Sequence, residues 1–231
     1  KHTVFEFLCH QDFSQKTSLD ALKSIDHKVK NRFVSVTEDT PLMRKYPAVP
    51  GQAGKNIYGE VLQPHEVKDL PLQTAPGSTV SEQDPCLLVA TRAGQPIAMR
   101  QTVRVDPILH LSGVNYDTGH IDFRGSVYVK GDVAEGFNIK ADGDVRVDGT
   151  VEDAVIEAQN HILVNGSVFG KSRALLKAGG NIMATYVQNA HIECLGNLQV
   201  KNGLFFSHAK VLGSVVVGAD QGHGRLHGGE I

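Results

Sequence analysis

The residues best suited to metal chemistry lie in a glycine-rich tail. His223, His227 and Glu230 stand close together in sequence, and two imidazoles with a carboxylate can ligate zinc. A metal site requires ligands held by rigid elements, whereas residues 221–230 contain four glycines. We therefore predict neither a metal site nor a cofactor.

Paired carboxylates are the next candidates for chemistry. Asp142 with Asp144, and Glu152 with Asp153, could in principle act as general acid and base. A glycoside-cleaving enzyme would cluster such groups in one exposed groove, whereas these stand mainly at expected corners, where Asp commonly forms turns. The chain has no Trp and only five Tyr, so no aromatic sugar-binding groove is evident. We predict no catalytic residues and no enzyme; a carbohydrate-active β-helix enzyme is one alternative.

Composition argues against nucleic-acid and membrane partners. The formal net charge is −2, and phosphate binding needs concentrated Lys and Arg. No stretch approaches the roughly 20 apolar residues that span a membrane. Cys9, Cys86 and Cys194 are far apart and odd in number, which is typical of reduced thiols in the cytoplasm rather than of a disulfide framework.

The chain changes character near residue 110. All nine prolines lie at or before Pro107, whereas 19 of the 24 glycines lie at or after Gly113. Proline cannot donate to a strand ladder, so its absence favours long continuous pairing. We predict a small β-rich domain over residues 1–110 and a parallel β-helix over residues 111–231.

Within the first domain, alternation and turn residues predict the elements. The expected strands cover residues 4–8, 33–36, 87–90 and 103–105, and residues 50–60 form a turn-rich loop. A short helix is expected over residues 19–29, with Ser18 as its N-cap.

The second domain contains an internal repeat of about 17 residues. Three apolar series carry it: Val127, Val145, Ile162, Ile182, Leu198 and Val215; Ile139, Ile156, Leu176, Ile192 and Val211; and Val133, Val151, Val168, Val187 and Leu204. Apolar residues alternate inside each repeat, which predicts strands. Three short strands then make one coil, and each pairs in parallel with its copy about 4.8 Å away. The irregular repeat length favours a right-handed β-helix, whose corners are expected to use Gly for positive φ.

The outward neighbours of these series form columns on the surface. Lys140, Glu157, Lys177 and Glu193 make a column of alternating charge, which penalises slipped registers. Two other columns expose apolar side chains, and exposed apolar patches often mark contact surfaces. The candidates for a protein interface are Tyr128, Leu163, Phe169, Met183 and Phe205. The alternative is that a flanking segment or the first domain covers them.

Four ordered motifs resemble those of one protein family. Residues 114–125 resemble its "VD-STGNIDF-G" motif, residues 131–141 follow the next motif, and residues 177–182 resemble its "KAGG-D/N-I" step. Upstream, residues 50–60 resemble its "PG--G--V-GE" loop. The chain therefore resembles the FapA family, flagellar assembly protein A. Its coils are also similar to the C-terminal domain of the division inhibitor MinC and, more loosely, to bactofilins.

The resemblance implies a bacterial, cytoplasmic and non-enzymatic scaffold. It implies a role in flagellar assembly or placement through a protein partner, which we expect to be a regulatory, polar or flagellar component. Recruitment to the cell pole would follow from such a partner. A self-assembling, filament-type β-helix that pairs through the uncapped end of its stack of coils is a second alternative, so a homo-oligomer is also considered.

Overall fold

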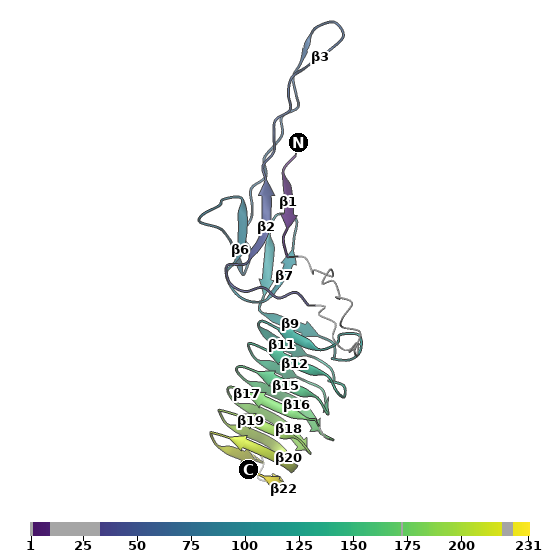
Figure 1. Ribbon diagram of the computed structural model, residues 1–231, viewed down its shortest axis with the longest axis vertical. Helices are drawn as coiled ribbons and strands as arrows, with labels where there is room; N and C mark the ends of the chain where they lie inside the picture. Colours follow the sequence, from purple (N-terminus) through teal and green to yellow (C-terminus); the bar gives the residue numbers. More distant parts are fainter. Residues whose placement is uncertain (1, 10–32, 172, 219–223) are drawn as a thin grey trace, which may run out of the picture. The chain divides into compact units, whose positions relative to one another are not determined.

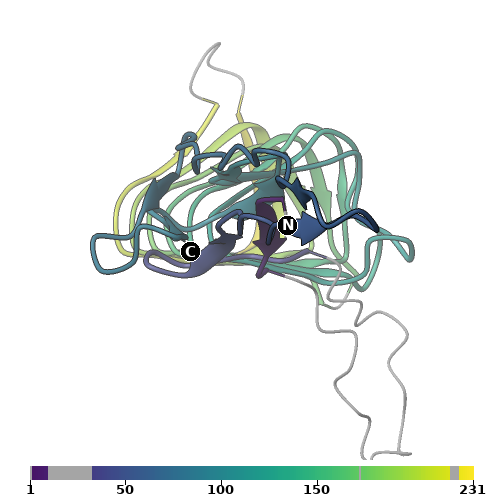
Figure 2. The same cartoon turned by 90° about the horizontal axis from the view of Figure 1, so that it is seen from above.

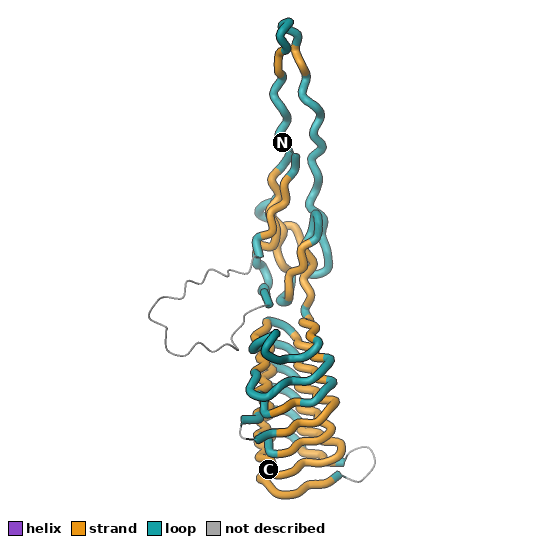
Figure 3. Tube along the Cα trace, turned by 90° about the vertical axis from the view of Figure 1, so that its right-hand side faces the viewer, coloured by secondary structure: helices purple, strands orange, loops and turns teal. Residues whose placement is uncertain are grey.

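The computed structural model describes residues 2–9, 33–171, 173–218 and 224–231, and all regular elements in these ranges are strands (Figure 3). The chain divides into two compact units. The first contains the N-terminal strand and Val36–Asp106, and the second contains residues 33–35 and Pro107–Ile231. The helix expected over residues 19–29 lies outside the described residues.

The first unit is built from short antiparallel strands. They are β1 (Val4–Phe7), β2 (Pro41–Tyr46), β3 (Gly54–Lys55), β4 (Val61–Leu62), β5 (Ser78–Val80), β6 (Leu87–Ala90), β7 (Gln95–Ala98) and β8 (Val103–Asp106). One sheet has the order β1-β2-β6-β5, while β3 pairs with β4 and β7 with β8. The unit has its own core, which includes Leu42, Met43, Leu88, Val103 and Val105.

Three of the four strands expected in this part are confirmed, as β1, β6 and β8. The strand expected over residues 33–36 is wrong, because only Val36 pairs, in an isolated bridge to Gly94. Phe33 packs against the core of the second unit, whereas Val36 belongs to the core of the first. The boundary between the two units therefore falls within this segment, between Ser35 and Val36.

The second unit is a parallel β-solenoid, visible as the stack of coils from teal to yellow in Figure 1. Its strands are β9 (Ile108–Leu111), β10 (Ile121–Phe123), β11 (Ser126–Val129), β12 (Asn138–Ala141), β13 (Val145–Val147), β14 (Val151–Glu152), β15 (Val155–Ala158), β16 (Ile162–Phe169), β17 (Leu175–Ala178), β18 (Ile182–Gln188), β19 (His191–Cys194), β20 (Leu198–Val211), β21 (Val215–Val217) and β22 (Arg225–Glu230). Seen along the stack, successive coils lie over one another (Figure 2).

Each coil contributes to three faces. The first face contains β9, β11, β13, the first residues of β16, β18 and β20, and β21. The second contains β14, the last residues of β16 and β18, the middle of β20, and β22. The third contains β10, β12, β15, β17, β19 and the end of β20.

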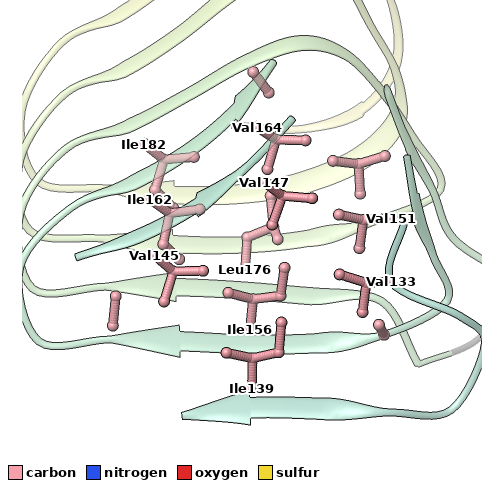
Figure 4. Packing of buried hydrophobic residues seen from close by; sticks show 14 of the residues in the cluster. Val133, Ile139, Val145, Val147, Val151, Ile156, Ile162, Val164, Leu176 and Ile182 are labelled. Carbon is pink, nitrogen blue, oxygen red and sulfur yellow. The ribbon is translucent and has the colours of Figure 1, made fainter. Parts of the chain in front are cut away.

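The inward residues form the stacked aliphatic columns that the repeat predicts (Figure 4). The series from Val127 to Val215 and the series from Val133 to Leu204 are confirmed residue by residue. In the third series the last member is wrong, because Ile192 pairs with Ala209 and Val211 pairs with Cys194. Ala209 is buried, whereas Val211 is only partly buried, so the inward position belongs to a small alanine and not to the larger apolar residue two positions further on.

A ladder of side chains holds one corner of the solenoid. At the start of the first face, one residue of each coil accepts a hydrogen bond with its side chain. The donor is the backbone N–H of the equivalent residue in the next coil. The acceptors are Ser126 Oγ, Asp144 Oδ1, His161 Nδ1, Asn181 Oδ1 and Asn197 Oδ1, at distances of 2.8–3.1 Å. These bonds satisfy backbone donors at the corner, which explains why side chains with an acceptor atom recur there.

Candidate interaction surface

The predicted interface residues lie on two faces of the solenoid. On the first face, Tyr128, Leu163 and Met183 occupy one outward column, in which Leu163 pairs with Met183. On the second face, Phe169 and Phe205 occupy another, two coils apart. Met183 and Phe169 are the exposed members, at 37% and 43% of their full surface, and the other three are half-buried.

Tyr128 is held in a polar network rather than displayed as a free apolar surface. Its hydroxyl donates to Asp148, which also accepts from Arg146 Nε at 3.0 Å and from Asn165 Nδ2 at 2.6 Å. The Arg146 guanidinium lies over the Tyr128 ring, and His110 meets that ring edge-on. Tyr128 therefore has a structural role at this surface.

Asp148→Asn is expected to destabilise the solenoid at neutral pH and to have little effect in acid. The Tyr128 hydroxyl bond, followed by the Arg146 bond, lowers the pKa of Asp148 below its ordinary value. The ionised carboxylate therefore stabilises the fold above the ordinary pKa of Asp, and this contribution is lost as pH falls through the lowered one. Urea unfolding of both proteins, followed by circular dichroism from neutral pH to about pH 2, measures the difference. Tyr128→Phe should reduce the same pH dependence, and a gap that persists in acid would contradict the assignment.

Three aromatic rings form a cluster on the second face. The Tyr186 ring centroid lies 5.6 Å from that of Phe169 and 5.3 Å from that of Phe205, with the latter pair stacked. Tyr186 pairs with Gly203 in the ladder, and a Cβ on Gly203 would lie 2.3 Å from the Phe205 ring. Glycine therefore leaves the space that lets Phe205 lie beneath Tyr186. We call Phe169, Tyr186 and Phe205 the aromatic cluster.

A further exposed aromatic side chain stands at the corner beside this cluster. Phe206 has a φ of 49°, a left-handed conformation that is rare for bulky residues. The preceding coil has Asn189 at the equivalent corner, with a φ of 54°, and the following coil has Gly228. The Phe206 ring meets His227 edge-on at 5.3 Å. The aromatic surface thus continues from the second face around the corner.

Sequence reasoning missed Tyr186 and Phe206 for identifiable reasons. The outward candidates on this face, Phe169 and Phe205, each follow an inward residue of the repeat, and the residues that precede the inward ones are not among the candidates. Tyr186 precedes Val187 and faces outward equally. Phe206 stands at a corner where Asn, Asp or Gly is expected. A phenylalanine gives no sequence signal of such a corner, so its position could not be predicted.

A hairpin in the first unit displays another pair of apolar side chains. Ile57 is 92% exposed and Tyr58 is 82% exposed, at the tip between β3 and β4. Asn56 fixes the tip, because its Oδ1 accepts the backbone N–H groups of Tyr58 and Glu60 at 2.9 and 3.0 Å. The turn-rich loop predicted at residues 50–60 thus contains a hairpin tip that holds two large apolar side chains exposed to solvent.

The third face carries a groove of about 760 Å³ along the alternating charge column. Four buried alanines belong to its lining, and Leu195, Leu212 and Ile231 are its exposed apolar members. Its carboxylates, on Glu157 and Glu193, each pair in the ladder with a lysine on either side. The charges of this column therefore alternate in sign, unlike the cluster of acidic groups that the glycosidase alternative requires.

The tail proposed as a possible ligand set is only partly described. His223 lies outside the described residues, and His227 and Glu230 lie in β22, paired with Phe205 and His208. Among the described residues there is no group of three His, Cys, Asp or Glu side chains that could hold a metal ion. The same part of the chain contains no helix long and apolar enough to cross a membrane.

The fold and these surfaces define a parallel β-solenoid protein with a separate β-rich N-terminal unit and an aromatic lateral face. The chain belongs to the Flagellar Assembly Protein A (FapA) family. The family's beta solenoid domain matches residues 107–231, and its N-terminal region matches residues 1–101. Comparison with curated proteins and with solved structures found no match.

Proposed function

We propose that this protein is a non-catalytic scaffold of flagellar assembly that binds a protein partner through the aromatic cluster. The observation that carries the proposal is the contact of Phe169, Tyr186 and Phe205 on one outward face. Aromatic side chains supply much of the binding energy in protein interfaces. Family membership supports the flagellar role.

The cluster is suited to binding because it is already ordered. Its residues belong to β16, β18 and β20, whose inward neighbours Val168, Val187 and Leu204 are completely or almost completely buried. A partner would therefore find side chains fixed by the solenoid, and little conformational entropy would be lost on binding. Exposed apolar side chains that are rigid and contiguous are typical of protein contact sites.

The hairpin tip at Ile57 and Tyr58 is a second contact site in this proposal. Two large apolar side chains on a fixed turn can enter a pocket of a partner. The partner we propose is a regulatory, polar or flagellar component of the bacterial cytoplasm. Binding it would bring the protein to the cell pole.

Replacing Phe169 and Phe205 with Ser is expected to abolish partner capture while the solenoid stays folded. The two rings are at least partly exposed, so removing them mainly alters the surface, and losing two aromatic anchors should weaken binding about 100-fold or more. Affinity capture from a flagellated bacterium, with quantification of the co-purified proteins, measures this. The same variant should fail to restore flagellar number and position in a strain that lacks the protein.

Two further variants make the test specific. Ile108→Ser removes an apolar side chain of similar exposure outside the cluster and should capture the partner normally. Ile57→Ser with Tyr58→Ser tests the hairpin tip separately. Retention of the same partner, at wild-type yield, by the Phe169 and Phe205 variant would refute binding through the aromatic cluster.

A further inference from the structure

The third face of the solenoid carries six charges that alternate in sign without interruption. From the first coil to the last they are Asp122, Lys140, Glu157, Lys177, Glu193 and Lys210, and each is paired with the next in the parallel ladder. Successive members are therefore separated by about one strand spacing, 4.8 Å. The column extends the four charges predicted from the sequence by one at each end.

Only two of these six charged side chains form an ion pair with each other within the chain. Among the described residues of the column, Lys177 and Glu193 form the one ion pair within 4 Å, with a separation of 3.5 Å. Both side chains of that pair remain about half exposed. The column thus presents charges that are ordered along the solenoid and accessible from outside.

The groove beside the column supplies an apolar surface. Leu195 is 66% exposed and Leu212 is 79% exposed, and both line the groove. One coil before Leu195 the equivalent position is Gly179, which has no side chain. An exposed leucine and a glycine without a side chain thus occupy equivalent positions of adjacent coils on the same face.

The relative orientation of two copies decides whether their charge columns attract or repel each other. If two copies packed face to face with their solenoids parallel and in register, every charge would meet one of the same sign. If one copy is reversed about a two-fold axis that runs across the face between two adjacent coils, every charge that lies within the overlap meets one of opposite sign. An alternating column is therefore complementary to its own reversed copy, and closed two-fold symmetry is the commonest arrangement of homo-oligomers.

We propose that the third face binds a second copy of this chain in antiparallel orientation, with the two-fold axis between the coils of Lys177 and Glu193. In this register Lys177 faces the partner's Glu193, and Glu157 faces the partner's Lys210. Leu195 of each copy lies over Gly179 of the other, where no side chain obstructs it. The contact spans few coils, so the dimer belongs to the small, concentration-dependent class.

The test is sedimentation velocity of the whole chain over a series of concentrations and salt levels. We expect a monomer–dimer equilibrium at low ionic strength that weakens about tenfold or more in high salt, because exposed charges are screened. Glu193→Lys and Lys177→Glu should each weaken dimerisation by about tenfold or more, since each places like charges opposite one another. An equimolar mixture of the two variants should dimerise again, because each reversed residue then meets a partner of opposite sign.

Two controls separate the proposal from a general effect of charge. Lys201→Glu reverses an exposed charge outside the column and should leave dimerisation unchanged. The double variant Lys177→Glu with Glu193→Lys keeps both the net charge and the complementarity, so it should dimerise even if one single variant folds poorly. A protein that stays monomeric at every concentration, a dimer indifferent to Glu193→Lys, or a mixture that fails to dimerise would each overturn the proposal.

Discussion

Asp153→Ala is expected to destabilise the solenoid by about 3 kcal/mol, because three backbone donors lose a charged acceptor at a buried site. Asp153 Oδ1 accepts the backbone N–H groups of Lys171, Arg173 and Ala174 at 2.7, 2.9 and 3.1 Å. The residue is buried, so water cannot easily replace the lost acceptor. Urea unfolding followed by circular dichroism measures the change, since the chain has no Trp for fluorescence.

Asp153→Asn is the matched control for this prediction. Asn retains a side-chain carbonyl acceptor and tolerates the left-handed backbone that Asp153 adopts, with a φ of 35°. It should therefore destabilise the solenoid clearly less than alanine does. Equal losses for the two variants would show that the three hydrogen bonds are not the source of the stability.

Asp153 also shows how far the sequence could be interpreted. Its pairing with Glu152 suggested acid–base chemistry, and its type suggested a turn former instead. The turn interpretation is correct, since the carboxylate accepts backbone N–H groups at the corner between β16 and β17. Which backbone groups the carboxylate binds could not be predicted. Asp153 bonds to residues of the next coil, and the sequence of that corner does not recur in the other coils.

The inward columns were predictable because apolar side chains must alternate on strands and recur once per coil. Val127, Val145 and Ile162 follow this rule closely, and the outward columns follow from it. The rule is weaker where an inward residue is small, as at Ala209. It also says nothing of how outward rings orient, so contacts such as that between Tyr186 and Phe205 emerge only in three dimensions.

Most of the glycines that close the repeats are needed for close packing between coils and not for positive φ. Positive φ was predicted for the glycines that close each repeat, and Gly218 does adopt it, with a φ of 91°. Gly131, Gly149 and Gly166 do not have positive φ. At each of them an added Cβ would lie 2.3 Å or less from an atom of the preceding coil. Glycine is needed there because stacked corners approach closely, not because the backbone is left-handed.

Gly166→Ala is therefore expected to destabilise the solenoid by about 2–3 kcal/mol, the cost of forcing an extra methyl group into a packed site. The added Cβ would lie 2.1 Å from the Gly149 carbonyl oxygen and 2.6 Å from its carbon. Both atoms belong to backbone, so relief requires that two coils separate locally, which weakens the ladder pairing of β16 with its neighbours. Urea unfolding by circular dichroism measures this loss.

Gly113→Ala is the control, because the same methyl group there would lie 3.2 Å from the nearest atom, the Asp132 carbonyl oxygen. A shift of a few tenths of an ångström relieves that contact, and alanine also reduces the conformational entropy of the unfolded chain. The two effects oppose each other, so Gly113→Ala should change the free energy of unfolding by less than about 1 kcal/mol. If both substitutions had the same small effect, close stacking of coils could not be the reason for glycine at position 166, and tolerance of the corner backbone would have to be much greater than its packing suggests.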